Sequence, residues 1–211
     1  MPARKSFQTR LATCTSTRNP STHEALETLR RSLASHQEPQ VSDSKKARGA
    51  VAVFIKEEDN DLWLLMIRRS ESSQDPWSGQ MAFPGGHAAN QDRSLFDTAA
   101  RETREEVGVD ACTQQFLGCL NNVYPKNAPM IVSPFVFLLL NKVDPRTSKE
   151  ADEIVWVPVP FLLDPKNIST FVVTIRGEET PMPCYNYSDH IIWGMSFRII
   201  REIVSKMTTH S

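Results

Sequence analysis

The sequence predicts an α/β sandwich in which a mixed β-sheet lies between layers of helices, with an α+β arrangement as the alternative. Two observations lead to this prediction: the predicted strands outnumber the predicted helices, and the main helices fall in the middle and at the end of the chain. No internal repeat is present. A chain of 211 residues can bury one core without disulfide bonds or a structural metal.

The predicted strands are short apolar runs bounded by turn residues. Val51–Ile55 and Leu62–Ile67 flank the polar stretch Glu57–Asp61, so we expect a β-hairpin there. The stretch Gly79–Phe83 leads into the turn Pro84-Gly85-Gly86. Further strands are predicted, in chain order, at Phe116–Val123, Pro134–Leu140, Ile154–Val157 and Phe171–Ile175.

Two further helices are indicated by apolar residues at helical spacing. Ser21 and Glu24 form a capping box, and leucines follow it at three- and four-residue intervals. The stretch Trp193–Lys206 has the same periodicity near the end of the chain. The apolar faces consist of Leu26, Leu29 and Leu33 in the first helix and Phe197, Ile200 and Val204 in the second.

The chain divides into three segments. Residues 1–23 contain basic and hydroxyl side chains and no acid, which suits a disordered tail or a mitochondrial transit peptide. Residues 24–48 are expected to form the short helix and a linker, and residues 49–208 the main domain. Because the four cysteines are scattered, we expect a reducing compartment, the cytoplasm, with the mitochondrial matrix as the alternative.

The charge distribution restricts the possible partners. Residues 1–48 carry nine Lys or Arg and four Asp or Glu, a net +5, whereas residues 49–211 carry fifteen and twenty-one, a net −6. An acidic main domain needs a bridging cation to bind a polyanion, so no nucleic-acid partner is expected. The longest apolar stretch, Met130–Leu140, is too short to span a membrane. We expect a small-molecule substrate and a monomer or homodimer.

The helix predicted between Leu95 and Val107 carries the chemistry. Ser94 and Asp97 fit a capping box, and Gly108 stands where a helix-terminating glycine belongs. On a helical wheel three carboxylates share an arc of about 100°, opposite a narrow apolar stripe. The carboxylates are Glu102, Glu105 and Glu106, and the stripe is Phe96, Ala100, Thr103 and Val107.

Clustered carboxylates on one helix face repel one another, and a hard divalent cation converts that repulsion into binding. Arg101 lies four residues before Glu105 and can pair with it. The alternative is a solvated acidic patch. The Gly-Gly turn, the apolar stripe and the arginine partner together favour a metal site.

These residues resemble the Nudix box, G-x5-E-x7-R-E-U-x-E-E-x-G-U, where U is aliphatic. The second half matches from Arg101 to Val109 except at Thr103. In the first half Arg93 stands at the glutamate position and Gly86 lies one residue further away. That longer spacing, and the upstream stretch GQMAFPGG that ends at Gly86, are similar to the coenzyme A diphosphatase-like branch.

The resemblance implies a Nudix-type α/β/α sandwich that hydrolyses coenzyme A or acyl-CoA to 3′,5′-ADP and (acyl-)4′-phosphopantetheine. The alternatives are a Nudix pyrophosphatase for another nucleoside diphosphate derivative, such as NADH or ADP-ribose, and a non-catalytic binding module. It implies Mg²⁺ or Mn²⁺ as the cofactor. The implied residues are Glu105 and Arg101 in catalysis, Glu102, Glu105 and Glu106 as metal ligands, and Arg68, Phe83, Gly86 and His87 in substrate binding.

Several roles stay open among residues of one chemical kind. The general base is a box glutamate or one of the acids Glu150, Asp152 and Glu153. The cations that could contact phosphate are Arg68, Arg69, Lys126 and Arg176, for each of which a solvated surface position is the alternative. The aromatic side chains that could stack on adenine are Trp77, Phe83, Tyr185 and Trp193, with core packing as the alternative.

Overall fold

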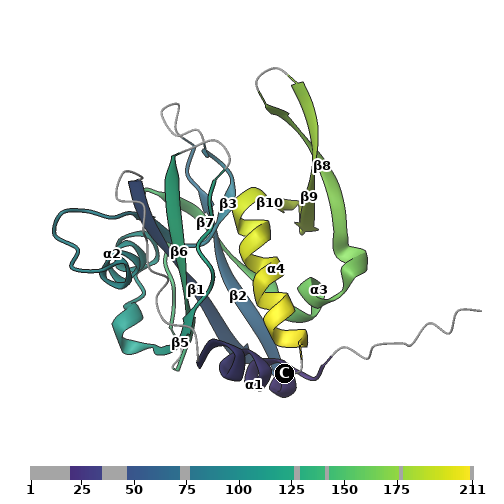
Figure 1. Cartoon of the computed structure of the whole chain (residues 1–211), viewed down its shortest axis with the longest axis horizontal. Helices are drawn as coiled ribbons and strands as arrows, with labels where there is room; N and C mark the ends of the chain where they lie inside the picture. The colour runs from purple at the N-terminus through teal and green to yellow at the C-terminus, as the bar shows by residue number, and fades with distance from the viewer. Residues whose placement is uncertain are drawn as a thin grey trace, which may run out of the picture.

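A mixed β-sheet lies between helices on both faces in the computed structural model of the chain, which confirms the predicted sandwich (Figure 1). The structure describes residues 20–34, 47–71, 77–125, 129–140, 143–175 and 178–209. The helices are α1 (Thr22–Ala34), α2 (Leu95–Val107), α3 (Val159–Leu163) and α4 (Gly194–Thr208), with short 3₁₀ helices at Ala111–Thr113 and Pro165–Asn167. The strands are β1 (Ala47–Glu58), β2 (Asp61–Arg69), β3 (Met81–Ala82), β4 (Gly85–His87), β5 (Gln115–Cys119), β6 (Met130–Leu138), β7 (Ala151–Pro158), β8 (Ile168–Ile175), β9 (Glu178–Tyr187) and β10 (His190–Trp193).

The main sheet has the order β3-β2-β1-β6-β5, with β7 also paired to β2 and β4 also paired to β1. Strands β1 and β6 run parallel, and the other neighbours in this sheet run antiparallel. The predicted hairpin between β1 and β2 is present. Its turn residues, Asp59 and Asn60, have φ values of 51° and 67°, which suit a tight two-residue hairpin turn. The strands therefore extend further toward the turn than the polar stretch indicated.

Small residues bring α2 close to one face of the sheet. Ala99 and Ala100 of the helix and Ala50 and Ala52 of β1 belong to the same buried cluster. Without bulky side chains between them, the helix axis approaches β1 closely. The predicted bounds of α2 are confirmed, with the Ser94 side chain accepting from the Asp97 N–H and Gly108 in a left-handed conformation.

The other face of the sheet is covered by α1, α3 and α4 (Figure 1). The expected capping box of α1 is present, since the Ser21 N–H donates to the Glu24 carboxylate at 2.9 Å. Helix α1 also crosses β5 so closely that a Cβ on Gly118 would lie 2.7 Å from the Leu33 carbonyl oxygen. Its three leucines, Leu26, Leu29 and Leu33, are buried in the core.

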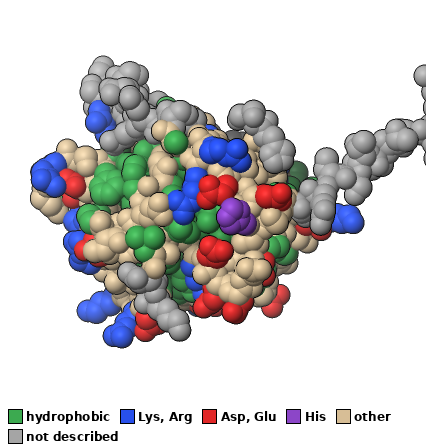
Figure 2. All heavy atoms as spheres, turned by 90° about the horizontal axis from the view of Figure 1, so that it is seen from below, with side chains coloured by type: hydrophobic (Ala, Val, Ile, Leu, Met, Phe, Trp, Pro, Cys, Tyr) green, Lys and Arg blue, Asp and Glu red, His purple; other side chains and the backbone are tan. Residues whose placement is uncertain are grey.

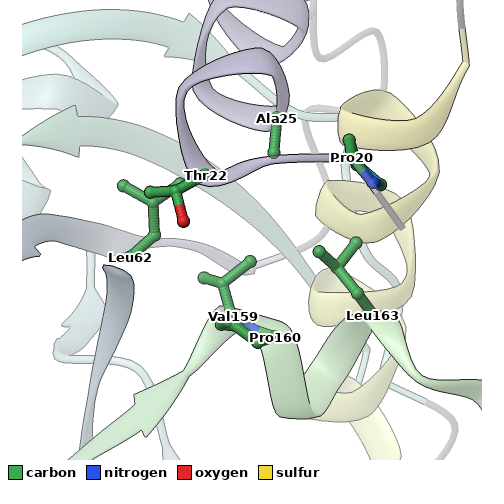
Figure 3. A pocket seen from close by; sticks show the side chains of 7 residues that line it. All are labelled: Pro20, Thr22, Ala25, Leu62, Val159, Pro160 and Leu163. Carbon is green, nitrogen blue, oxygen red and sulfur yellow. The ribbon is translucent and has the colours of Figure 1, made fainter. Parts of the chain in front are cut away.

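The surface near α1 offers little space for a ligand. A hollow of about 50 Å³, far too small for a nucleotide, lies between the start of α1, the start of β2 and α3 (Figure 3). It is lined by Pro20, Thr22, Ala25, Leu62, Val159, Pro160 and Leu163. On the face seen from below, acidic, basic and hydrophobic side chains are interspersed (Figure 2).

A second antiparallel sheet, of order β10-β9-β8, follows the main one, and the β8–β9 hairpin extends away from the body of the molecule (Figure 1). The sequence predicted β8 but missed β9 and β10. Strand β9 contains Pro181 and Pro183, and proline is unfavourable in a strand unless its missing N–H would face away from the partner. The short helix α3 was also not predicted. Among the described residues, no helix combines the length and apolarity needed to cross a membrane.

Candidate active site

Two consecutive glycines place the backbone of β4 between the central strand and α2. Gly85 and Gly86 pair with Val51 and Ala50 of β1. A Cβ on Gly86 would lie 2.5 Å from the carboxylate carbon of Glu102, so only glycine leaves this side chain in place. Gly85 and Gly86, which the sequence predicted as part of a turn, are instead in strand β4, where their backbone lies against the helix carboxylates.

Glu106 is a buried carboxylate at the base of this contact, with only 1% of its surface exposed. The Gly85 N–H donates to its Oε2 at 2.8 Å, and the Arg69 guanidinium lies 3.9 Å from its Oε1. Burial raises the pKa of the Glu106 carboxyl to about 7, although both of these groups favour the charged form. The site thus holds a carboxyl group whose charge is poorly compensated by the protein alone.

Glu102 lies one helical turn before Glu106, with 12% of its side chain exposed. Burial raises the pKa of its carboxyl group, and hydrogen bonding to Arg101 opposes that rise. The carboxylate lies 2.7 Å from the Arg101 guanidinium. Glu102 and Glu106 are therefore two adjacent carboxylates in a largely water-excluded position.

Arg101 is held by several oxygen atoms around the start of α2. Its Nε and one terminal nitrogen each donate to the Asp92 carboxylate at 3.0 Å, and a terminal nitrogen donates to the His87 carbonyl at 3.0 Å. The pairing expected from the i,i+4 spacing is present, at 3.1 Å to Glu105. Arg101 consequently ties the Gly-Gly strand, the loop before α2 and the box glutamates together.

Asp92 was missed in the sequence because it lies outside the acidic run of the helix. Its carboxylate accepts from Arg101, from the Ala89 N–H at 2.9 Å and from the Thr98 hydroxyl at 2.9 Å. The Arg101 hydrogen bonds hold the pKa of the Asp92 carboxyl well below its usual range. In the sequence, the feature that could have indicated Asp92 is its position in the loop just before α2, nine residues before Arg101.

We expect Asp92→Asn to lower kcat at least about tenfold, because Arg101 loses a charged bidentate partner and no longer fixes the glutamates. The amide retains an oxygen for the Ala89 N–H, so the loop remains capped. The matched control is Asp97→Asn, which alters the ion pair with Arg93 at 2.9 Å and the hydrogen bond from the Arg93 N–H at 3.2 Å, and should leave kcat unchanged. Equal kcat values in the two variants would contradict the role of Asp92.

The third box glutamate, Glu105, differs from the other two because 58% of its side chain is exposed; like Glu102, it pairs with Arg101. Within the part of the chain that the structure describes, no group of three His, Cys, Asp or Glu side chains is arranged to hold a metal ion. The donor set still suits a divalent cation: hard carboxylate oxygens on Glu102 and Glu106 lie beside the backbone of Gly86, and their charge is costly without one.

A cavity of about 740 Å³ opens beside these glutamates. It is lined by five of the predicted site residues, Phe83, Gly86, His87, Glu102 and Glu106. It is also lined by four residues whose roles the sequence left open, Arg69, Trp77, Glu150 and Trp193. Lining residues that the sequence did not indicate include Met182, Pro183, Ser196 and Arg198.

Other predicted residues lie elsewhere. The neighbouring arginines of β2 diverge, so that Arg69 lines the cavity whereas Arg68 pairs with Glu153 at 3.2 Å. Glu153 also contacts His190 at 3.0 Å. Tyr185 is fully buried and donates its hydroxyl to the Leu162 carbonyl, so it belongs to the core. Asp152 accepts from the Ser70 hydroxyl. Lys126 and Arg176 lie outside the described residues.

The raised pKa of Glu106 predicts a pH-dependent stability for the metal-free protein. The folded state retains the Glu106 proton up to a pH of about 7, whereas the unfolded chain releases it near 4.5. The free energy of unfolding should therefore fall as the pH rises between these values, by about 3 kcal/mol from this group. Urea unfolding of the unchanged protein and of Glu106→Gln, both in the presence of a chelator, isolates the contribution of the Glu106 carboxyl group. If the free energy of unfolding changed with pH in the same way in both proteins, the predicted contribution of Glu106 would be contradicted.

The fold, the Gly-Gly strand and the acidic helix define a class of protein that comparison with known sequences identifies. The NUDIX domain model matches residues 46–172, so the chain belongs to the Nudix family. Its relatives place it among the hydrolases of that family. The Nudix hydrolase NudL of Photorhabdus laumondii, described as uncharacterized, is 32% identical over 145 residues, which cover 68% of this chain and 76% of that protein.

The chain is also similar to a coenzyme A diphosphatase. The mitochondrial coenzyme A diphosphatase NUDT8 of Homo sapiens is 30% identical over 139 residues. The match covers 63% of this chain and 58% of the human protein. The fold itself resembles the crystal structure of a MutT/nudix family protein from Enterococcus faecalis, with a TM-score of 0.51, 19% identity and coverage of 88% of this chain and 69% of that one.

Proposed function

We propose that this Nudix hydrolase cleaves the diphosphate bond of coenzyme A or acyl-CoA, giving 3′,5′-ADP and (acyl-)4′-phosphopantetheine. The observation that carries the proposal is a cavity of about 740 Å³ whose lining combines the carboxylates of α2 with aromatic and apolar side chains. Such a combination suits a ligand that joins a metal-bound diphosphate to a base and an apolar arm. The similarity to the human coenzyme A diphosphatase supports the same substrate class.

Glu102, Glu105 and Glu106 are proposed to hold Mg²⁺ or Mn²⁺. The exposed side chain of Glu105 reaches the cation by a change of rotamer, since its backbone lies on the same helix face. When bound, a divalent ion neutralises diphosphate oxygens and makes a water molecule more acidic. Arg101 keeps Glu102 and Glu105 in place by its hydrogen bonds to Asp92 and the His87 carbonyl.

The water that attacks phosphorus needs a proton acceptor. Of the three acids after the β6–β7 connection, only Glu150 lines the cavity, whereas Asp152 and Glu153 are bonded to Ser70 and Arg68. We therefore assign the base to Glu150 or to a box glutamate. Both are carboxylates that can accept the proton of the attacking water.

The substrate contacts follow from the cavity lining. We propose that Arg69, rather than Arg68, meets the diphosphate, because Arg69 lines the cavity together with His87 and Gly86. Phe83, with 3% of its surface exposed, presents an aromatic ring at the same wall. The other arginine of the lining is Arg198 on α4, the candidate for the 3′-phosphate of coenzyme A.

A panel of substrates tests the proposal. Coenzyme A, acetyl-CoA, dephospho-CoA, NADH and ADP-ribose are incubated with Mg²⁺ or Mn²⁺, and the products are identified by mass. We expect 3′,5′-ADP from coenzyme A and a kcat/KM at least about tenfold lower for dephospho-CoA, which lacks the phosphate that Arg198 would meet. Equal rates for the two would favour a broader Nudix pyrophosphatase. Inactivity on every member would favour the non-catalytic module.

A further inference from the structure

The lining of the cavity is rich in methionine, and Met182 and Met195, called the methionine wall, come from elements on the other side of the main sheet from α2 (Figure 1). The lining includes Met81, Met130, Met182 and Met195, four of the seven methionines in the chain. They come from four elements, β3, β6, β9 and α4. Thioether side chains are flexible and polarizable and adapt to apolar ligands of variable shape. This composition suits a long flexible chain better than a planar base.

The strand that supplies Met182 offers few hydrogen-bond donors on this wall. Met182 is flanked by Pro181 and Pro183, and all three line the cavity. The prolines pair with Val172 and Thr170 of β8, and neither proline has a backbone N–H. A phosphate or carboxylate therefore finds no backbone N–H donor at these two prolines. A neutral apolar group needs no such donor and can pack against them.

The two walls stand on opposite sides of the main sheet. The carboxylates come from α2, and Met182 and Met195 come from the second sheet and α4, on the other side (Figure 1). Trp193 continues the apolar wall and contacts Phe171 of the β8–β9 hairpin, with ring centres 6.1 Å apart. If the diphosphate of a substrate is held at the glutamates, the other end of the same substrate can therefore contact the methionine wall.

We infer that this wall binds the acyl chain of an acyl-CoA and that Met182 makes the enzyme prefer acylated over free coenzyme A. The inference rests on the proposed function and adds to it a substrate preference and the element that sets it. Each methylene transferred from water to such a wall should raise kcat/KM by about threefold to fourfold until the wall is filled. The acyl group remains intact, since the bond that is broken lies in the diphosphate.

The test compares kcat/KM for free, acetyl-, butyryl-, hexanoyl- and octanoyl-CoA in the full chain and two variants. In the unchanged protein we expect the ratio of octanoyl-CoA to free coenzyme A to be well above ten. Met182→Ser should lower that ratio at least about fivefold, because the wall loses an apolar side chain. Val172→Ser is the matched control: Val172 is 53% exposed, lies opposite Pro181 and is not part of the lining, so its ratio should equal that of the unchanged protein.

The outcomes separate the inference from the function on which it rests. Cleavage of free and acylated coenzyme A at the same kcat/KM, or an unchanged ratio in Met182→Ser, overturns the acyl wall and leaves the diphosphatase proposal standing. Cleavage of NADH or ADP-ribose, with none of coenzyme A or its thioesters, overturns both. Circular dichroism melting of the two variants confirms that each ratio is measured on folded protein.

Discussion

Replacing Glu106 by glutamine should lower kcat by about 10²–10³-fold while the protein remains folded. The amide has nearly the same shape as the carboxyl group and keeps an oxygen that can accept from the Gly85 N–H, which lies 2.8 Å from Glu106 Oε2 in the unchanged protein. What it removes is the negative charge that a divalent cation requires in the buried part of the site. The measurement is the steady-state rate on the best coenzyme A substrate at pH 8, where most of the unchanged protein carries this charge.

The control for this experiment is Glu57→Gln, the same chemical change at an exposed position at the end of β1. It should leave kcat unaltered. Melting temperatures of the two variants show whether folding is preserved. Near-normal turnover by Glu106→Gln would refute the assignment of the metal site to this helix.

The two neighbouring glycines of β4 should respond to alanine in different ways. At Gly85 a Cβ would lie 2.2 Å from the Ala50 carbonyl oxygen and 2.5 Å from the Val51 Cα, and φ is +152°. Backbone atoms cannot move aside, so Gly85→Ala should separate β4 from β1 and cost more than about 3 kcal/mol of stability. At Gly86 the clash is with the end of the Glu102 side chain, which can rotate away.

Gly86→Ala should therefore leave the melting temperature within a few degrees of normal and lower kcat about tenfold to a hundredfold, because Glu102 is displaced. Thermal unfolding and steady-state rates of both variants test the contrast. A stable, fully active Gly86→Ala protein would mean that the position of Glu102 is unimportant. A stable Gly85→Ala protein would contradict the close pairing of β1 and β4.

Local signals in the sequence were sufficient to predict the part of the fold that carries the carboxylates. The caps Ser94 and Gly108 fix the ends of α2, and its small residues indicate a helix packed tightly on the sheet. The β1–β2 hairpin follows from two apolar runs. Strand β9 could not be predicted, because Pro181 and Pro183 interrupt its pattern and its pairing with β8 decides its conformation.

The site was predicted where it depends on one helix and missed where it depends on tertiary contacts. Glu102, Glu105, Glu106 and Arg101 fall on one helical face, which spacing alone reveals. The selection of Arg69 over Arg68 depends on which side of β2 faces the cavity, and both sides of that strand are covered. The methionines that line the cavity come from four elements far apart in the chain, so no local pattern marks them.

The close crossing of α1 over β5 limits how far the chain can be shortened from its N-terminal side. Among the described strands β5 pairs only with β6, and α1 covers its face on the side of the main core. A protein cut back to Ala47 would expose the apolar core side chains that Leu26, Leu29 and Leu33 cover and should aggregate. A shortened chain that keeps this packing must therefore retain α1 together with its capping residue Ser21.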